Sequence, residues 1–185
     1  PGCVFVALPG SSADGSQFIA DAVARGAGYV VCRPESAGNC GEAEVVDCAD
    51  PRQALGLLAR ARYGTASLPF PVVGVTGTNG KTTTTYLVEH IASVAGNRCG
   101  VIGTVGNKIA GVMEHAERTT PESYELHALF ARMRDAGCTH VIMEVSSHSL
   151  VLDRVHGIRF AVGAFTNLTQ DHLDFHKTMD AYCDA

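Results

Sequence analysis

The chain has 185 residues, of which 46% are hydrophobic and 18% are charged, with 20 glycines and no tryptophan. This is the composition of a globular protein, and it excludes a disordered, collagen-like or coiled-coil chain. The formal net charge is −5 and no run of basic residues occurs. A protein that binds the phosphate backbone of nucleic acids is therefore not expected. No apolar stretch approaches the roughly 20 residues of a membrane span, and the N-terminus lacks a signal-peptide pattern, so we expect a cytoplasmic protein with no membrane insertion.

The cysteines indicate reduced thiols. They number 7, mostly lie in or beside apolar runs and never form a C-x-x-C pair, so neither a disulfide framework nor a zinc site is favoured. The chain begins with Pro1 instead of methionine and stops inside an apparent helix at Thr178 to Ala185. We therefore expect a fragment that is cut at both ends.

Short β-branched runs alternate with helical segments in the first third of the chain. The predicted strands are 4–8, 29–32 and 44–48, and the predicted helices are 16–25 and 51–64. Asp50 is expected to cap the second helix, whose first position is Pro51. The prolines of Ser67-Leu-Pro-Phe-Pro71 disfavour helix and central strand. They predict a boundary between an N-terminal domain, 1–68, and a second domain, 69–185, with a loop inside one domain as the alternative.

The same alternation continues in the second part. The predicted strands are 72–76, 99–105, 139–145 and 160–168, and the predicted helices are 82–95 and 121–136. In the first of these helices, Leu87, Ile91 and Val94 are expected to face the core. In the second, the apolar stripe is Leu126, Leu129, Phe130 and Met133. The pattern predicts an α/β fold with a mostly parallel sheet and flanking helices.

A glycine-rich loop is the strongest functional signal. Gly74-Val-Thr-Gly77-Thr-Asn-Gly80-Lys81-Thr82 connects the strand 72–76 to the helix 82–95. Glycines let successive backbone N–H groups approach phosphate oxygens, and the helix N-terminus adds its positive end. Lys81 supplies a charge for the β- and γ-phosphates, and the Thr82 hydroxyl is a ligand for Mg²⁺. The pattern is G-x-x-G-x-x-G-K-T, and the alternative is a glycine turn that binds nothing.

Glu144 is the acidic candidate. It closes the apolar strand 139–145, and ligands of parallel sheets gather beyond the carboxyl ends of the strands. A buried carboxylate must be paired, protonated or bound to a cation, so Mg²⁺ beside the phosphate loop is the favoured partner. A helix cap or a salt bridge is the alternative. A nucleophile within Ser146-Ser147-His148 is disfavoured, because no G-x-S-x-G elbow surrounds these residues.

Histidines follow the last predicted strand, in Asn167-Leu-Thr-Gln-Asp-His-Leu-Asp-Phe-His176. His172 and His176 are four residues apart, but Leu173 stands where a zinc protease needs glutamate, so zinc is disfavoured. A histidine or an aspartate here could complete the shell of a second Mg²⁺ near the γ-phosphate. The alternative is a solvated polar loop.

Two consecutive threonines precede the helix 121–136. Thr120 is expected to cap it, with Pro121 in the first turn. Capping does not explain Thr119 as well, so the pair could also hold an anionic substrate. Both interpretations stay open.

Taken together, four motifs in chain order resemble those of the ATP-dependent Mur ligases, most closely the tripeptide-forming members. The motifs are Gly77-Thr-Asn-Gly-Lys-Thr-Thr83, Thr119-Thr-Pro121, Glu144-Val-Ser-Ser-His148 with Arg154, and Thr166-Asn-Leu-Thr-Gln-Asp-His-Leu-Asp-Phe-His176. The stretches Pro1-Gly-Cys-Val-Phe-Val-Ala7 and Ala13-Asp-Gly15 resemble the family's uridine-nucleotide domain. The resemblance therefore covers essentially the whole chain. It implies a small N-terminal α/β module for the UDP substrate and an incomplete P-loop domain, without the C-terminal domain for the amino acid.

The resemblance also implies roles for particular residues. ATP would be held by Gly77, Thr78, Asn79, Gly80, Lys81, Thr82 and Thr83. Mg²⁺ would be served by Thr82, Glu144 and His172, and the catalytic residues would be Lys81, Glu144 and His172. The UDP part of the substrate would face Ser11, Ser12 and Ala13. The muramoyl peptide would contact Thr119, Thr120, Ser146 and Arg154.

The implied reaction is ATP-dependent amide formation. The γ-phosphoryl group would pass to the D-glutamyl carboxylate of a UDP-N-acetylmuramoyl dipeptide, and a diamino acid, diaminopimelate or lysine, would attack the acyl phosphate. Phosphoryl transfer of this kind needs mainly positioning and charge neutralisation. The alternatives are another Mur-type or a folyl-polyglutamate-type ligase, and a P-loop protein that binds nucleotide without catalysis.

Overall fold

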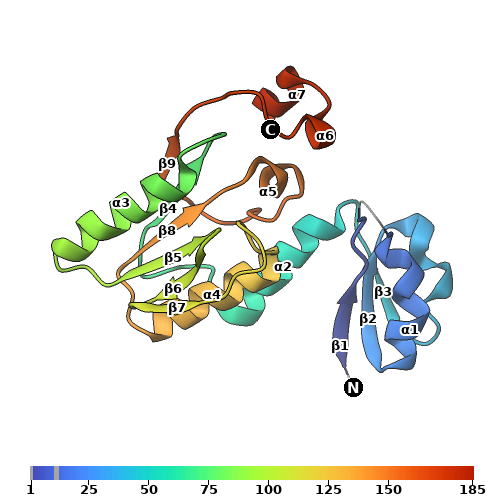
Figure 1. Cartoon of the computed structure of the whole chain (residues 1–185). Coiled ribbons are helices and arrows are strands. Elements are labelled where there is room, and N and C mark those ends of the chain that lie inside the picture. The colour runs from blue at the N-terminus through green and yellow to red at the C-terminus, as the bar shows by residue number, and fades with distance from the viewer. Residues whose placement is uncertain (1, 11–12) are drawn as a thin grey trace. The chain divides into compact units, whose positions relative to one another are not determined.

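The structure, a computed structural model, describes residues 2–10 and 13–185. The chain divides into two compact units, Pro1–Leu58 and Ala59–Ala185. Each contains a sheet with parallel strands and helices, so the predicted α/β class is confirmed (Figure 1). The division lies inside a helix, whereas the predicted boundary at 68/69 lies in the proline-rich segment that follows. The domain limits 1–68 and 69–185 stay a prediction.

The first unit contains a three-stranded parallel sheet of order β1-β2-β3. The strands are β1 (Cys3–Val6), β2 (Ala27–Cys32) and β3 (Glu44–Asp47). A 3₁₀ turn leads into α1 (Ile19–Ala24), and Gly26 ends that helix with a φ of +98°. Ile19 is fully buried in a small core with Ala7, Val30, Cys32 and Cys40. Ile19 therefore anchors α1, which lies within the predicted helix 16–25, to the sheet.

The helix α2 (Pro51–Tyr63) starts as predicted from its capping residues. Asp50 Oδ1 accepts hydrogen bonds from the backbone N–H of Arg52 at 2.9 Å and of Gln53 at 3.3 Å. These bonds satisfy amides that have no partner within the first turn of the helix. The predicted cap is confirmed.

The second unit contains a six-stranded sheet of order β7-β6-β5-β8-β4-β9. Its strands are β4 (Val72–Thr76), β5 (Cys99–Gly103), β6 (Gly106–Ile109), β7 (Val112–Glu114), β8 (His140–Glu144) and β9 (Val162–Phe165). The pairs among β5, β8, β4 and β9 are parallel, and β6 and β7 add an antiparallel hairpin at one edge. At the other edge, β9 exposes Val162 and Phe165 by 54% and 65%. The hairpin is the one part of the sheet that the sequence pattern did not predict.

Helices cover the two faces of this sheet. On one face, α4 (Ser123–Asp135) packs Leu126, Phe130 and Met133 into the main core with strand residues such as Val141 and Met143. The predicted apolar stripe of α4 is confirmed. On the opposite face, α3 (Lys81–Val94) packs Val88 and Ala92 beside Ile142, whose side chain alternates with those of its neighbours in β8 (Figure 1).

The start of α4 differs from the prediction. Its N-cap is Glu122, which forms a reciprocal capping box with Glu125, and not Thr120. Pro121 accordingly lies before the helix. Thr120 is buried and uses its hydroxyl elsewhere, as described below.

The orientation of α3 also corrects the prediction. Leu87, Ile91 and Val94 were expected in the core, but their exposed fractions are 58%, 68% and 76%. The side facing the sheet carries Thr85 and Glu89, both buried. Polar partners compensate for the burial of Glu89, because Lys108 Nζ of β6 lies 2.9 Å from Glu89 Oε1. Polar contacts, and not the largest apolar residues, therefore decide which side of α3 faces the sheet.

Short helices follow the last two strands. They are α5 (Ser147–Val151) after β8, and α6 (Leu173–His176) and α7 (Met179–Asp184) after β9. Among the described residues, no helix has the length and apolar character needed to cross a membrane.

Candidate nucleotide and substrate site

The phosphate loop joins β4 to α3 and depends on its glycines. Gly77 and Gly80 have φ angles of +121° and +86°, values that side chains disfavour. A Cβ on Gly77 would lie 2.2 Å from Thr166 Oγ1 and 2.8 Å from the carbonyl oxygen of Asn167. Gly77 is therefore required both by its backbone conformation and by the segment packed against it.

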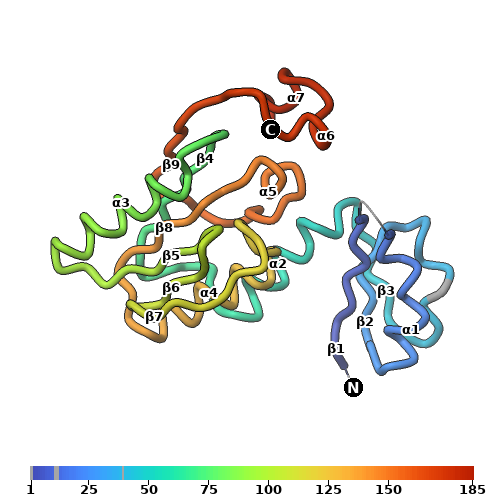
Figure 2. The backbone as a smooth tube through the Cα atoms, viewed as in Figure 1, coloured from blue at the N-terminus to red at the C-terminus, as the bar shows by residue number. Residues whose placement is uncertain are grey.

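That segment is the chain directly after β9, which passes the loop in Figure 2. The backbone N–H groups of Thr78 and Asn79 donate to the carbonyl oxygen and Oδ1 of Asn167 at 2.8 and 3.2 Å. Thr166 Oγ1 donates to the carbonyl oxygen of Asn79 at 2.8 Å. These contacts hold the loop from outside. The sequence signal for this contact was the predicted strand 160–168, which contains Thr166 and Asn167, because the carboxyl ends of parallel strands lie at one edge of the sheet.

The lysine of the loop lies over its backbone. Lys81 Nζ donates to the carbonyl oxygens of Gly77 at 2.7 Å and Thr78 at 3.0 Å. Thr82 and Thr83 follow it in the first turn of α3, where backbone N–H groups have no partner within the helix. A cationic amine and free amides thus gather at one helix N-terminus, which is an arrangement suited to phosphate.

Glu144 lies beside this helix start. Its side chain is fully buried, and Glu144 Oε2 accepts a hydrogen bond from Thr82 Oγ1 at 2.9 Å. Thr104, at the end of β5, donates its backbone N–H to Oε1 at 3.0 Å and its hydroxyl to Oε2 at 3.1 Å. No lysine, arginine or histidine in the described ranges 2–10 and 13–185 forms an ion pair with Glu144. Neither the helix cap nor the salt bridge, the alternatives for this residue, is what the structure shows.

These residues fit a magnesium ion. A buried carboxylate without a cationic partner and a hydroxyl at 2.9 Å are oxygen donors at the edge of a phosphate-binding loop. Within the described part of the chain, no cluster of three or more His, Cys, Asp and Glu side chains is grouped to hold a metal alone. Mg²⁺ commonly keeps several water ligands and binds phosphate oxygens of the nucleotide. It therefore needs only one or two ligands from the protein.

His172 lies in a cluster of rings that contacts the loop through Tyr182. The ring centroid of His172 is 4.8 Å from that of His148 and 6.2 Å from that of Tyr182. Tyr182 Oη lies 3.0 Å from Thr78 Oγ1. The structure thus brings His172 to the same edge of the sheet as the loop. It records no hydrogen bond or ion pair between His172 and Thr82 or Glu144. His172 as a metal ligand stays a prediction.

Two histidines of this cluster, His148 and His176, have lowered pKa values. Burial, and then the neighbouring His172 and His176, lower the pKa of His148. Burial and His172 likewise lower the pKa of His176, whose Nε2 lies 2.9 Å from Ser147 Oγ. Both rings therefore bind a proton less readily than a free imidazole does. Ser147 contacts His176 and not the adjacent His148, so the disfavoured nucleophile pairing of Ser147 with His148 is absent from the described contacts.

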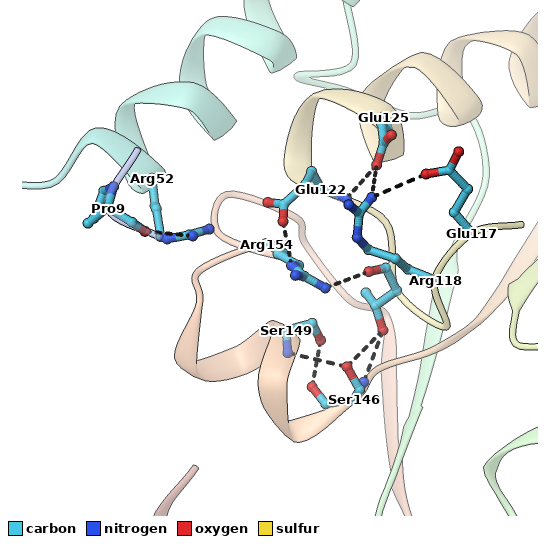
Figure 3. A network of polar contacts seen from close by, with 10 residues as sticks. Pro9, Arg52, Glu117, Arg118, Glu122, Glu125, Ser146, Ser149 and Arg154 are labelled. Carbon is cyan, nitrogen blue, oxygen red and sulfur yellow. Dashed lines mark hydrogen bonds and ion pairs between the residues drawn. The ribbon is translucent and has the colours of Figure 1, made fainter. Parts of the chain in front are cut away.

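The candidate peptide-binding residues lie around Glu144, and Figure 3 labels two of them, Ser146 and Arg154. Thr119 Oγ1 lies 2.9 Å from Thr104 Oγ1. Thr120 Oγ1 donates to the carbonyl oxygen of Glu144 at 3.0 Å and accepts from the N–H of Ser146 at 3.0 Å. Ser146 is the N-cap of α5, where its Oγ accepts from the N–H of Ser149 at 3.3 Å. The structure brings Thr119, Thr120 and Ser146 together, and it ties them to the strand that carries Glu144.

Arg154 joins the same group (Figure 3). Its Nη1 donates to the carbonyl oxygen of Thr120 at 3.2 Å, and its Nε lies 2.9 Å from Glu122 Oε1. The side chain of Arg154 is only 15% exposed. An arginine held in this way keeps a fixed orientation, which is the condition for planar recognition of a carboxylate.

The predicted UDP-facing residues are only partly described. Ser11 and Ser12 lie outside the described residues, and Ala13 is exposed. Among the described residues of the first unit, Arg52 Nη2 donates to the carbonyl oxygen of Pro9 at 2.9 Å (Figure 3), and Asp14 accepts from the N–H of Ser16 at 2.8 Å. A Cβ on Gly15 would lie 2.6 Å from the backbone nitrogen of Leu8, so this turn needs its glycine. The roles of Ser11, Ser12 and Ala13 stay predictions.

Comparisons with known proteins agree with this arrangement. The model of the Mur ligase family catalytic domain matches residues 1–63, and the model of the Mur ligase middle domain matches residues 75–185. A UDP-N-acetylmuramoyl-L-alanyl-D-glutamate--2,6-diaminopimelate ligase from Lawsonia intracellularis is 54% identical over 184 residues, covering 100% of the chain and 38% of that protein.

Solved structures are similar as well. A structure of a UDP-N-acetylmuramoyl-L-alanyl-D-glutamate--2,6-diaminopimelate ligase has a TM-score of 0.84 and 31% identity, covering 100% of this chain and 37% of that one. A MurF ligase from Thermotoga maritima in complex with ADP has a TM-score of 0.58 at 21% identity, covering 99% of this chain and 38% of that one, which shows a shared fold. The chain thus spans less than two fifths of the length of these relatives. With family models matching both of its units, and the phosphate loop and Glu144 meeting inside the matched middle domain, the chain belongs to the Mur ligase family.

Proposed function

We propose that this chain is the UDP-substrate and ATP-binding part of an amide ligase of peptidoglycan precursor synthesis. The reaction is the ATP-dependent addition of a diamino acid, diaminopimelate or lysine, to UDP-N-acetylmuramoyl-L-alanyl-D-glutamate. The names of the similar proteins favour 2,6-diaminopimelate.

One observation carries the proposal. Thr82, in the first turn after the phosphate loop, donates at 2.9 Å to the buried carboxylate of Glu144 at the end of a different strand. This contact combines a phosphate-binding helix start with an acidic group that has no cationic partner in residues 2–10 and 13–185. That combination is expected where a magnesium nucleotide is bound, and structural capping gives no reason for it.

The residues of the loop would position and neutralise the triphosphate. Lys81 Nζ, which now donates to loop carbonyls, would turn to the β- and γ-phosphates, and the amides at the start of α3 would face phosphate oxygens. Thr82, Glu144 and His172 would hold Mg²⁺, which when bound neutralises negative charge on the phosphates. Asn167 and Thr166 keep the loop in shape from the side of β9.

The substrate carboxylate would be held by residues at the exit of β8. Arg154, Thr120, Thr119 and Ser146 surround the exit of β8, next to Glu144. A carboxylate resists attack by an amine until one oxygen becomes a leaving group, and transfer of the γ-phosphoryl group to that oxygen provides one. The resulting acyl phosphate loses phosphate when the amine attacks its carbonyl carbon. The contribution of these residues is orientation of the carboxylate in line with the γ-phosphate.

The test uses the full-length protein with ATP, Mg²⁺ and the UDP-N-acetylmuramoyl dipeptide. We expect ADP, phosphate and an amide product when diaminopimelate or lysine is added, with mass spectrometry of the product and a phosphate-release assay as the measurements. Dihydrofolate or tetrahydrofolate with glutamate serves as the substrate set of a folyl-polyglutamate-type ligase. Product from that set alone, or nucleotide binding without turnover in either set, would overturn the proposal.

A further inference from the structure

The carboxylate of Glu144 is fixed by a residue that no motif identified. Thr104 follows β5 directly and donates from both its backbone N–H, at 3.0 Å to Oε1, and its hydroxyl, at 3.1 Å to Oε2. The preceding residue, Gly103, leaves room for this approach, since a Cβ there would lie 2.2 Å from Glu144 Oε1. The turn between β5 and β6 is therefore shaped around this one carboxylate.

The directions of these hydrogen bonds follow from counting protons. An ionised carboxylate, the state that metal binding requires, only accepts hydrogen bonds. The single hydroxyl proton of Thr104 is therefore directed at Glu144 Oε2. The contact of 2.9 Å between the hydroxyls of Thr104 and Thr119 then needs Thr119 as its donor. The result is a directed chain, from Thr119 to Thr104 to Glu144.

A second connection runs to the backbone of the same residue. Thr120 Oγ1 donates to the carbonyl oxygen of Glu144 at 3.0 Å and accepts from the N–H of Ser146 at 3.0 Å. The two consecutive threonines therefore hold Glu144 through its side chain and through its main chain. This explains a threonine pair for which helix capping gave no reason.

We propose that Thr104 is a positioning residue that orients Glu144 for Mg²⁺ and couples the metal site to the candidate peptide site at Thr119. The inference rests on the proposed function and deepens it. A muramoyl substrate that engages the Thr119 hydroxyl changes the donor available to Thr104, and this alters the hydrogen bond that Thr104 gives to Glu144. By linkage, substrate and metal then change each other's affinity by the same factor.

The first test measures metal binding without turnover. Mn²⁺ replaces Mg²⁺ as a spectroscopic probe, and the full-length protein is titrated with Mn²⁺ in the presence of ADP while free Mn²⁺ is followed by electron paramagnetic resonance. We expect Thr104→Val, which keeps the backbone donor and removes the hydroxyl, to weaken Mn²⁺ binding about tenfold, the lower end of the usual effect of outer-shell partners. Thr104→Ser, unlike Thr104→Val, keeps the hydroxyl, and it should bind Mn²⁺ nearly as the wild type does.

A matched control lies at the other end of the neighbouring strand. Thr139 precedes β8, is exposed, and accepts from the N–H of Arg98 at 3.1 Å. Thr139→Val removes a threonine hydroxyl of the same sheet without approaching Glu144, so its Mn²⁺ affinity should equal that of the wild type. Circular dichroism and the melting temperature show whether each variant is folded.

The second test measures the coupling. The Mn²⁺ titration is repeated with the UDP-N-acetylmuramoyl dipeptide present, and the ratio of the two affinities is the coupling factor. We expect the factor to fall toward one in Thr104→Val and in Thr119→Val, with no further change in the double variant, because both break the same chain. If Thr104→Val does not fold, Thr119→Val alone still tests the chain through loss of coupling.

The outcomes separate this inference from the proposed function. Wild-type protein that binds neither Mn²⁺·ADP nor the dipeptide would overturn the proposed function. Wild-type binding together with an unchanged affinity in Thr104→Val would overturn the positioning role alone. A coupling factor that stays at its wild-type value in Thr119→Val would overturn the link between the two sites.

Discussion

Burying a carboxylate without a counterion costs solvation free energy. The groups around Glu144 must therefore replace the hydrogen bonds that water would donate. The hydroxyl of Thr82 and the hydroxyl and N–H of Thr104 do so from two neighbouring elements. Hydrogen bonds compensate for lost solvation but leave the negative charge unbalanced. This is the electrostatic state in which a cation binds with the largest gain.

Lys81 is expected to be the main cationic group for the phosphates. Lys81→Ala in the full-length protein should lower kcat by about 10²–10³-fold, the usual cost of losing one group that stabilises developing charge. ATP affinity should fall as well, because the substitution removes the cationic amine of the phosphate loop. In the structure this amine, Lys81 Nζ, donates to the loop carbonyls of Gly77 and Thr78. Steady-state kinetics and calorimetric titration with ATP measure both effects.

The control for this substitution is Arg25→Ala, which removes an exposed cation that pairs with Asp21 in the first unit. It should leave kcat and ATP affinity at their wild-type values. Survival of both turnover and ATP affinity in Lys81→Ala would contradict the assignment of the phosphate loop.

Gly103 offers a test of how tightly the Glu144 carboxylate is enclosed. In Gly103→Ala the new methyl group would lie 2.2 Å from Glu144 Oε1, so the carboxylate must move. We expect Mn²⁺ affinity in the presence of ADP to fall about 10–100-fold, and stability in urea to fall by about 1–3 kcal/mol. Gly163→Ala is the matched control, since a Cβ at Gly163 of β9 meets no atom within 4 Å. Equal behaviour of the two variants would refute the enclosure.

At this scale the sequence predicted some contacts and missed others for a physical reason. Thr82 and Glu144 could be predicted to approach each other, because a phosphate loop and a buried acidic strand end meet at one edge of a parallel sheet. Thr104 could not, since it lies in a turn before a hairpin, and an isolated polar turn residue has no periodic signal. Asn167 belongs to the motif Thr166 to His176, but its hydrogen bonds with the loop amides depend on the pairing of β9 with β4.

Among the elements, α4 contains a buried histidine that links stability to pH. His127 is 1% exposed, its Nδ1 lies 2.7 Å from Thr65 Oγ1, and its ring packs edge-on against Phe130. Burial, and then the charge of Arg60, lower its pKa from 6.5 to about 4. The folded state therefore binds fewer protons than the unfolded state between these two pH values, and stability falls as the pH falls through this window.

The expected result is a loss of wild-type stability between pH 7 and pH 4.5 that exceeds the loss in His127→Leu. The difference should be on the order of 2–3 kcal/mol, since each unit of pKa corresponds to about 1.4 kcal/mol. Urea unfolding at the two pH values measures it. His115→Gln, which changes an exposed histidine, should behave as the wild type does. An identical pH dependence in His127→Leu and the wild type would show that His127 is not the group responsible.

The elements also show where periodicity is informative and where it misleads. The apolar stripe of α4 predicted its buried face, because that helix lies against a hydrophobic sheet surface. In α3 the same reasoning chose Leu87, Ile91 and Val94, which are exposed. There, Thr82 must reach Glu144 and Glu89 must reach Lys108, and these polar contacts fix the rotation of the helix.

For the molecule as a whole, the division into two compact units predicts that ligands act on them separately. ADP with Mg²⁺ at about 100 times its dissociation constant should add about 2.7 kcal/mol to the unfolding free energy of the unit Ala59–Ala185. UDP should stabilise only Pro1–Leu58, which contains the predicted uridine-facing residues. Scanning calorimetry of the full chain with each ligand measures the two shifts. A single transition raised equally by both ligands would contradict this expectation.

The sheet of the second unit has a consequence for the chain in concentrated solution. Among the described strands β9 pairs only with β4, so the N–H and C=O groups along its outer side are offered to any passing strand. With Val162 and Phe165 54% and 65% exposed on this strand, apolar contact would strengthen such pairing. When residues 1–185 are produced alone, these polypeptides should therefore join edge to edge as their concentration rises, and light scattering should detect growing particles. Val162→Lys places a charge where a neighbouring strand would dock, and it should keep the particles small without altering nucleotide affinity.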